Sequence, residues 1–586
     1  MSKQRVDPHV LLILLLSVFA VAPLTAPGFF LNAHDATIGA YFLWQFDAGL
    51  RDGVWWPVWG ADMVYGYGYP LFLVIAPLAY YVAEGFLLLG LGIVGALKAT
   101  YALAMLLSGL AMYAFARRWL GRYGGLVAAV AYVYIPYHLV DIYVRADLAE
   151  FAALTFFPAV LWSVDTLMQA SRRRQHLRGI AVLALSYGGL VLTHFTMGVI
   201  FTPVVAGYAL WEAVFIGAES AGSPARPNRS MREIVGRLAA PVASLALGLA
   251  LAAGFVLPAL AELRFLQSND LAGGYFSYTK HFVYFFQFFS PFWGYGYAGE
   301  GPVDQMPYQL GMVPVVLALV TLIALPGGLR RDDLEVTQRD ELSRWAAFFL
   351  LLTGLFVFLM LGVSQSLWDL FRPVVAFIQF PWRLLVITGL SLAFLAGVLV
   401  AARRELAPIL IVLLILASYT YTAPQYTDGD VSLKKMIEFE LRTHELLGDT
   451  IWVKERPQTS PLVAQYLAGQ PLTKAVALTE GATVQTLRAG GASVEARVTS
   501  SVDAQVGFYT RYFPGWRATV DGKELPLEPW GDQGLIRVQV PAGDHTVRLR
   551  YEDTPARTAG KAASLLTFLG VLWMLGAARE GRAGQG

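Results

Sequence analysis

Residues 27–70 read PGFFLNAHDATIGAYFLWQFDAGLRDGVWWPVWGADMVYGYGYP and separate the first hydrophobic segment of the chain from the next. Near its start this stretch carries Asn32, His34 and Asp35, and aromatic residues crowd the rest of it. A long loop that follows a first membrane segment holds acidic side chains at the boundary between lipid and water, where ionisable groups usually mark a site. The loop is therefore the first candidate for chemistry.

The composition indicates a polytopic membrane protein. Hydrophobic residues make up 56% of the 586 positions and charged residues only 15%, and the mean hydropathy is +0.52. These values exclude an ordinary soluble protein. The chain has no cysteine, which excludes disulfides and thiol catalysis. Arginines occur in short separated clusters and not along one basic face, which argues against a nucleic-acid partner.

Hydrophobic stretches near the ~20 residues needed to cross a bilayer predict about 12 transmembrane helices. The segment 70–88 contains two prolines and Glu84, so we expect an amphipathic helix that lies in the outer leaflet. Basic clusters at 117–122, 172–178 and 403–404 then share the cytoplasmic side, as the positive-inside rule requires. The predicted protein spans the plasma (inner) membrane many times, with both termini in the cytoplasm. The predicted crossings are 9–26, 93–116, 124–140, 151–168, 179–193, 196–215, 238–258, 311–326, 345–361, 384–402, 406–420 and 562–578.

Residues 421–560 change character and predict an extracytoplasmic β-sandwich. Apolar and polar residues tend to alternate in four segments, as they do in half-buried strands. Asp521-Gly522 is a hairpin signal, and a partly helical stretch near 431–448 precedes the strands. We therefore divide the chain into a transmembrane domain (1–420), a β-rich domain (421–560) and a final transmembrane helix with a cytoplasmic tail (561–586). The four segments are 506–512, 517–520, 535–540 and 546–551.

The order of these features resembles the GT-C glycosyltransferases, membrane enzymes that take a sugar from a polyprenyl-phosphate carrier at the outer surface. The resemblance lies in the acidic first loop (NAHD, 32–35), the flat helix after it, and YVRADLAE (143–150) in the second outer loop. The phrases THFTMG (193–198), QFPWR (379–383) and YFPGWRATVDGK (512–523) resemble the YfhO-like and "6-pyruvoyl-tetrahydropterin synthase-related" bacterial membrane proteins. The resemblance implies a GT-C-like fold, EC 2.4 activity, a polyprenyl-phosphate sugar donor, and a glycan, lipid or protein acceptor.

Sugar transfer needs a carboxylate that deprotonates or orients the acceptor. The resemblance places Asp35 in that role, with His34 beside it as a second proton or metal contact. The alternative for Asp35 is the N-cap of a helix that begins near residue 36.

Asp147 and Glu150 form a second acidic site, since residues three apart share one face of a helix. The alternative there is a weak Asp141–Arg145 pair. No cofactor is certain from the sequence; a divalent cation, Mg or Mn, would take Asp35, Asp147 and Glu150 as ligands.

Cations and aromatic side chains complete the predicted site. Arginine suits a carrier phosphate because its planar fork donates two hydrogen bonds at once. Arg383 is the first choice, and its alternative role is snorkelling at the interface beside Trp382. Aromatic residues stack on sugars but also form the belt of a membrane protein, so both roles stay open. The donor-phosphate candidates are Arg145, Arg264, Lys280, Arg372 and Arg383, and the acceptor or sugar contacts are His194, Tyr65, Tyr67 and Glu300.

Three functions follow from these residues. The leading hypothesis is a glycosyltransferase at the extracytoplasmic face with the first-loop Asp35 as base. The second is a transporter or flippase of lipid-linked substrates; the charges cluster at the outer rim, and the sequence shows neither an ATP-binding P-loop nor an inverted repeat. The third is a non-catalytic, glycan-binding membrane scaffold.

Overall fold

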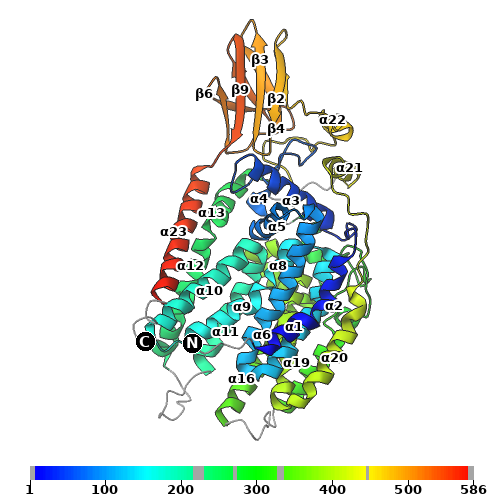
Figure 1. Cartoon of the computed structure of the whole chain (residues 1–586), viewed down its shortest axis with the longest axis vertical. Helices are drawn as coiled ribbons and strands as arrows, with labels where there is room; N and C mark the ends of the chain where they lie inside the picture. The colour runs from blue at the N-terminus through cyan, green and yellow to red at the C-terminus, as the bar shows by residue number, and fades with distance from the viewer. Residues whose placement is uncertain (1–6, 216–229, 268–272, 326–335, 444–447, 579–586) are drawn as a thin grey trace.

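A bundle of helices forms the body of the molecule, and two antiparallel sheets stand at one end of it (Figure 1). The computed structural model describes residues 7–215, 230–267, 273–325, 336–443 and 448–578. Within these ranges, 10 helices are long and apolar enough to cross a membrane. The predicted class, a polytopic helical protein with a C-terminal sheet region, is confirmed. The chain ends that were assigned to the cytoplasm (1–6 and 579–586) lie outside the described residues.

Most helix boundaries lie close to the predicted crossings. The predicted helices 93–116 and 124–140 fall largely in α6 (Gly92–Tyr134), where two helical parts meet at a kink at Gly121 (φ 69°, ψ −179°), between the two predicted crossings. The predicted crossing 311–326 corresponds to α15 (Met312–Ala324), which has 13 residues. Residue 326 of the predicted crossing is not described. The other helices of the body are α1 (Pro8–Leu16), α2 (Val18–Val21), α7 (Pro136–Val140), α8 (Leu148–Ala153), α9 (Phe156–Met168), α10 (Arg173–Thr193), α11 (Phe195–Phe215), α12 (Met231–Leu251), α13 (Ala253–Glu262), α16 (Val336–Met360), α19 (Leu385–Ala402), α20 (Ala407–Ser418) and α23 (Pro555–Ala577).

The loop between the first two spans folds into short helices beneath the sheets. They are α3 (Ala36–Arg51), α4 (Leu71–Val74) and α5 (Leu78–Leu88). The 11 residues of α5 reach about 16 Å at 1.5 Å per residue, too short for ~30 Å of hydrocarbon. This length agrees with the expectation that 70–88 does not cross.

Among the described residues, nine strands build the two sheets, in the orders β1-β4-β8-β7 and β2-β3-β9-β5-β6. The four strands expected from alternation appear as β4, β5, β8 and β9, and positive φ at Asp521 (49°) and Gly522 (85°) closes the expected β5–β6 hairpin. The strands are β1 (Ala475–Ala477), β2 (Thr483–Ala489), β3 (Ser493–Ser500), β4 (Ala504–Arg511), β5 (Trp516–Val520), β6 (Lys523–Leu525), β7 (Leu527–Trp530), β8 (Leu535–Val540) and β9 (Gly543–Tyr551).

Helix α3 is held at its far end by the β2–β3 hairpin. The Asp52 carboxylate, just beyond α3, accepts hydrogen bonds from Ala492 N (2.9 Å) and Ser493 Oγ (2.7 Å) and pairs with Arg488 (2.6 Å). A Cβ on Gly491 would lie 2.4 Å from the Ala48 carbonyl oxygen, so only glycine permits this close approach. Figure 1 shows α3 directly beneath the sheets.

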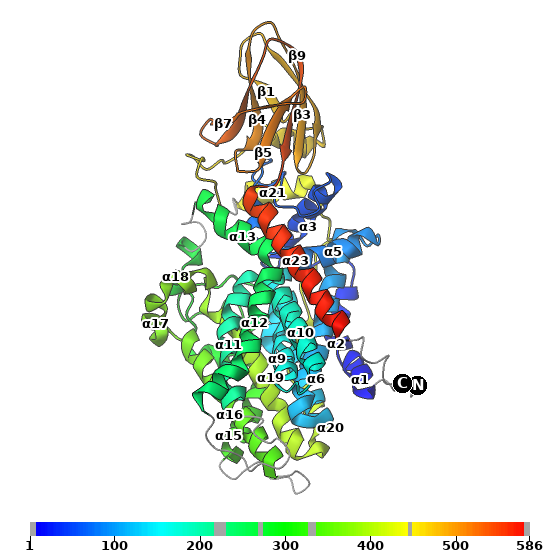
Figure 2. The same cartoon turned by 90° about the vertical axis from the view of Figure 1, so that its left-hand side faces the viewer.

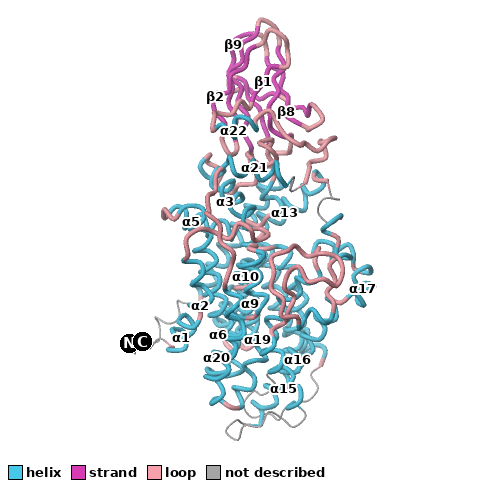
Figure 3. Tube along the Cα trace, turned by 90° about the vertical axis from the view of Figure 1, so that its right-hand side faces the viewer, coloured by secondary structure: helices cyan, strands magenta, loops and turns pink. Residues whose placement is uncertain are grey.

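Two short helices between the bundle and the sheets, α21 (Leu433–Thr443) and α22 (Val463–Ala468), form hydrogen bonds with the aromatic part of the first loop. Glu440 of α21 accepts hydrogen bonds from the backbone N–H groups of Val64 (2.9 Å) and Tyr65 (2.6 Å). Tyr466 of α22 donates to Asp62 (2.7 Å). The loop therefore packs against α21 and α22, and Figures 2 and 3 show α21 between the sheets and the bundle.

Helix α23 leads from the last strand back along the bundle (Figure 2). At this junction Arg557 is 1% exposed and donates to Glu262 of α13 (2.6 Å), to the Pro514 carbonyl (3.0 Å) and to the Tyr551 hydroxyl (2.5 Å). A single arginine thus joins α13 and the candidate span α23 to the sheets.

Candidate functional site

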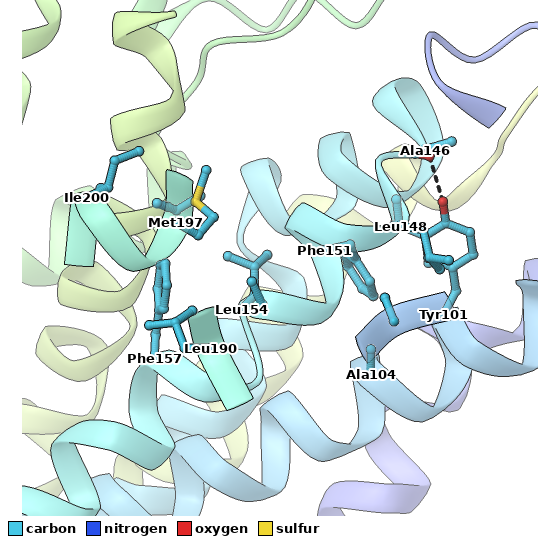
Figure 4. Close-up of a cluster of buried hydrophobic side chains, with 14 of the residues drawn as sticks. Tyr101, Ala104, Ala146, Leu148, Phe151, Leu154, Phe157, Leu190, Met197 and Ile200 are labelled. Atoms are coloured by element: carbon cyan, nitrogen blue, oxygen red, sulfur yellow. Dashed lines mark hydrogen bonds between the residues drawn. The ribbon is translucent and has the colours of Figure 1, made fainter. Parts of the chain in front are cut away.

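The backbone reverses sharply between α7 and α8. Asp141–Arg145 form a π-helical turn, and Ala146 follows in the left-handed region (φ 53°, ψ 36°). Asp147 then caps α8 by accepting a hydrogen bond from Glu150 N (3.0 Å). The Tyr101 hydroxyl donates to the Ala146 carbonyl (2.6 Å; Figure 4) and holds the reversal in place. Such strained turns concentrate at functional sites.

The reversal brings three carboxylates onto one guanidinium. Arg145, which is 2% exposed, lies 2.5 Å from Asp141, 2.6 Å from Glu150 and 3.3 Å from Asp147. Its guanidinium also lies 4.9 Å from the centre of the Trp382 ring. The Asp141–Arg145 pair is present, but the expectation of a weak surface pair is wrong, because both side chains are buried within a larger network.

Arg383 joins the cluster from a different part of the chain. It belongs to a short 3₁₀ turn, Pro381–Leu384, which precedes α19. Its Nε donates to Glu150 Oε2 (3.0 Å), and its Nη1 donates to the side chain of Gln379 (2.9 Å). Glu150 therefore has a guanidinium on each oxygen, and the Tyr137 hydroxyl also donates to it (2.8 Å). These contacts define the acid–arginine cluster: Asp35, Asp141, Arg145, Asp147, Glu150 and Arg383.

Asp35 lies at the edge of this cluster with a free carboxylate. Its backbone N–H donates to the Arg145 carbonyl (2.7 Å), which fixes the first loop against the second. Asp35 occupies the N-cap position of α3, but its side chain makes no capping hydrogen bond, and no partner for it exists among the described residues. Burial, and then the Asp147 charge, raise the pKa of Asp35 to about 7, against the opposing influence of Arg145 and Arg383.

His34 turns away from the cluster toward the 295–297 loop. Its Nε2 lies 3.2 Å from the Tyr295 carbonyl, and its ring stacks on Tyr297 at 4.5 Å between centroids. Burial and the Arg145 charge lower the pKa of His34 to about 4. The imidazole is therefore neutral at physiological pH, and its ring helps to hold the loop.

His194 lies close enough to Asp147 and Glu150 for the three side chains to share one metal ion. Asp147, Glu150 and His194 each offer one ligand atom, and these atoms lie within 4.8 Å of one another. His194 ends α10, and its Nδ1 accepts from Met197 N (3.3 Å), which leaves Nε2 for a ligand. Burial lowers the pKa of His194, which favours the neutral form that binds metal. The three side chains that lie close enough to share a metal ion are therefore Asp147, Glu150 and His194, whereas the predicted set had Asp35 in place of His194.

The charges of the cluster fit a cation. Four carboxylates face two guanidinium groups, which leaves an excess of negative charge, and one buried oxygen of Asp141 has no hydrogen-bond partner among the described atoms. Glu150 already spends both oxygens on arginines. Asp147 and His194 are therefore the ligands that fit best, with Glu150 shared between a metal and Arg145.

Several predicted site residues lie elsewhere. Tyr65 is fully buried against α21 and Tyr67 is 5% exposed and contacts β4, so neither lies in the cluster. Four others are exposed, and within the described ranges none contacts the cluster: Arg264 (over the Phe265 ring), Lys280, Arg372 and Glu300. The donor-phosphate candidates in the cluster are thus Arg145 and Arg383.

Sequence reasoning missed Tyr137 and Gln379, and it underrated Asp141. A signal was present, because 137, 141 and 145 recur at four-residue spacing and so share a helix face. Gln379 likewise stands four positions before Arg383. Trp382 was noted only as an interfacial neighbour, whereas it covers the Arg145 guanidinium.

Comparison with known proteins gives weak structural likenesses and no family. No family model and no curated protein matches the chain. Among solved structures, the arabinofuranosyltransferase AftD from Mycobacteria matches 76% of this chain at 15% identity and a TM-score of 0.42, and the chain spans 29% of that protein. The Archaeoglobus fulgidus oligosaccharyltransferase, in complex with Zn and sulfate, matches 75% at 11% identity and 0.39, and the chain spans 55% of it.

ArnT from Cupriavidus metallidurans bound to undecaprenyl phosphate matches 70% of the chain at 14% identity and a TM-score of 0.27, over 80% of that protein. TM-scores under 0.5 at these identities establish neither a shared fold family nor a shared function. The likeness to YfhO-like proteins stays a prediction.

Proposed function

We propose that this chain is a membrane glycosyltransferase that moves a sugar from a polyprenyl-phosphate-linked donor to an acceptor hydroxyl, with Asp35 as the general base. One observation carries the proposal. A partly buried carboxylate without a hydrogen-bond partner stands beside a buried acid–arginine cluster, and its pKa is raised to about 7. A base of that pKa is half ionised at neutral pH, which suits proton abstraction.

The proposed step balances as a substitution at the sugar's anomeric carbon. Asp35 accepts the proton of the acceptor hydroxyl while that oxygen forms a bond to the anomeric carbon. The bond from that carbon to the carrier phosphate oxygen breaks, and the electron pair leaves with polyprenyl phosphate. Arg383, with Arg145 behind it, stabilises the negative charge on this leaving group, because fixed guanidinium groups in a water-poor site act strongly on a developing charge.

The remaining residues of the cluster position these groups. Glu150 orients both guanidinium groups through its two oxygens, and Tyr137 fixes Glu150. A divalent cation held by Asp147 and His194 would add Lewis-acid stabilisation of the departing phosphate.

The test is turnover by the purified full-length chain in nanodiscs with a panel of synthetic polyprenyl-phosphate sugars. Release of polyprenyl phosphate is followed by mass spectrometry in the presence of sugar acceptors. We expect one donor to turn over, and we expect Asp35→Asn to abolish this. Asp47→Asn is the matched control, since Asp47 lies on α3 and pairs only with the largely exposed Arg51 (2.7 Å). Turnover by Asp35→Asn at the control rate would remove the assignment.

A further inference from the structure

The connection between α16 and α19 carries an apolar stripe that faces away from the protein. It contains α17 (Gln365–Leu370) and α18 (Arg372–Val375). Leu367, Leu370, Phe371 and Val374 recur at the spacing of one helical face, and all are exposed, with Leu370 at 69% and Val374 at 59%. Trp368, on the opposite side, is 4% exposed. The apolar side chains of the stripe thus face away from the protein, whereas Trp368 packs against it.

The loop that carries the 3₁₀ turns η5 (Tyr278–Lys280) and η6 (Phe285–Phe289) extends the same surface. The Tyr278 hydroxyl donates to Asp369 (2.6 Å), and the Tyr278 ring stacks on Trp368 at 5.4 Å, so this loop packs directly against α17. Next along the loop, Phe285 is 61% exposed and Phe286 is 54% exposed. We call this surface the apolar platform. Its exposed members are Tyr284, Phe285, Phe286, Phe289, Val363, Leu367, Leu370, Phe371, Val374 and Phe377.

The position of the platform identifies what covers it. It begins directly after α16, a candidate membrane span whose last turns expose Leu355 and Phe358, so the platform continues a surface that faces lipid. α17 projects sideways from the sheet-domain half of the bundle (Figures 2 and 3). An element of six residues is too short to span, which leaves the interfacial layer of the leaflet as its place.

Two cations stand among these apolar side chains. Lys280 and Arg372 are exposed, and no ion pair with either is present in the described part of the chain. Basic side chains beside a buried apolar face attract anionic headgroups. We propose that the apolar platform inserts into the leaflet on the sheet-domain side and that Lys280 and Arg372 hold anionic phospholipid there. The segment continues through Phe377 to Gln379 and Arg383, so the platform fixes the depth of the acid–arginine cluster relative to the lipid phosphates.

The chain has no cysteine, so one introduced thiol gives a unique labelling position. Leu370→Cys and Val374→Cys are spin-labelled separately in the full chain, in nanodiscs of phosphatidylcholine with phosphatidylglycerol. Accessibility to oxygen and to a water-soluble nickel chelate reports the depth of each label. Leu566→Cys, on the exposed face of α23, is the control within the membrane, and Thr499→Cys, on β3, is the control in water.

We expect both platform labels to gain oxygen contact and lose nickel contact relative to Thr499→Cys. Labels that match Thr499→Cys overturn the proposal, as do labels shielded from both reagents, which would indicate a protein partner. In the labelled variants that keep Lys280 and Arg372, we expect the labels to move toward water when phosphatidylglycerol is removed. We expect the double change Lys280→Gln and Arg372→Gln to abolish this dependence on phosphatidylglycerol. Equal depth in both lipids overturns the role of the two cations. The measurement does not involve sugar transfer, so it stands apart from the catalytic proposal.

Discussion

Replacing Asp35 by asparagine is expected to stabilise the protein above neutral pH while it abolishes turnover. The reasoning starts from the raised pKa. In the folded chain Asp35 keeps its proton up to about pH 7, whereas the unfolded chain releases it near 3.8. Between these values the folded state binds more protons, so the stability of the wild type falls as pH rises, and the loss is complete above pH 7. Asparagine is neutral throughout and escapes this loss.

The size of the effect follows from the two pKa values. Their separation corresponds to at most about 4 kcal/mol at 1.36 kcal/mol per pKa unit, and partial contact with water lowers this to ~2–3 kcal/mol. At ~2.1 cal/mol/K per residue, cooperative unfolding of all 586 residues gives ~1.2 kcal/mol/K. The expected rise in Tm is therefore ~2 °C at pH 8, and it vanishes near pH 4.

The assay is thermal unfolding of both proteins in nanodiscs from pH 4 to pH 8, with Asp47→Asn as control. A difference in Tm that does not change with pH would refute the electrostatic reasoning. Turnover supplies the second readout. Loss of a general base removes ~10²–10⁴-fold in rate, and the wild-type rate rises with pH through about 7 as Asp35 ionises. A wild-type rate that is flat between pH 6 and pH 8 would contradict the base assignment.

Three further predictions concern the surrounding network. Glu150→Gln leaves two buried guanidinium groups without their shared carboxylate, so we expect a loss of ~3–5 kcal/mol in stability and no turnover; an unchanged denaturation midpoint would show that the cluster tolerates the charge. His194→Ala is expected to weaken Mn²⁺ binding to the purified chain, measured by isothermal titration, and chelators are expected to lower wild-type turnover; equal Mn²⁺ affinity would exclude His194 as a ligand. Arg557→Met strands the buried Glu262 carboxylate, which also costs ~3–5 kcal/mol; Arg517→Gln, which breaks exposed pairs with Glu524 and Glu552, is the control and is expected to cost under ~1 kcal/mol.

The sequence predicted those elements whose pattern is local. Spanning helices follow from hydrophobic length, and four strands with the Asp521-Gly522 turn follow from alternation. Five of the nine described strands lie outside the four predicted segments. β1, β6 and β7 have only three or four residues, which is too few to show a pattern. β2 and β3 are longer, and β3 alternates Val494, Ala496 and Val498 with polar residues, so a signal was present there. The kink at Gly121 falls between the predicted crossings 93–116 and 124–140 and agrees with that boundary.

The candidate site was predictable only in part. Asp35, Asp147 and Glu150 could be named because acidic residues at a membrane boundary are rare. Their arrangement could not, because it depends on Arg383, which lies 233 positions from Glu150 along the chain. Arg372 was predicted, like Arg383, to hold the donor phosphate, although Arg383 was the first choice. The structure separates them, since only Arg383 lies where Glu150 pairs with it.

The helix that starts at Asp35 and finishes in the grip of the β2–β3 turn has a consequence for dissecting the protein. Deleting residues 475–551 would remove the hydrogen-bond partners of Asp52 and so release one end of α3. The proposed base, Asp35, lies at the other end of that helix. We therefore expect a bundle without the sheets to be a poor catalyst. A replacement for the sheets would need glycines at 490 and 491, where the β2–β3 turn approaches Asp52 and Ala48. Natural variation at 490–491 and at 52 is accordingly expected to be linked.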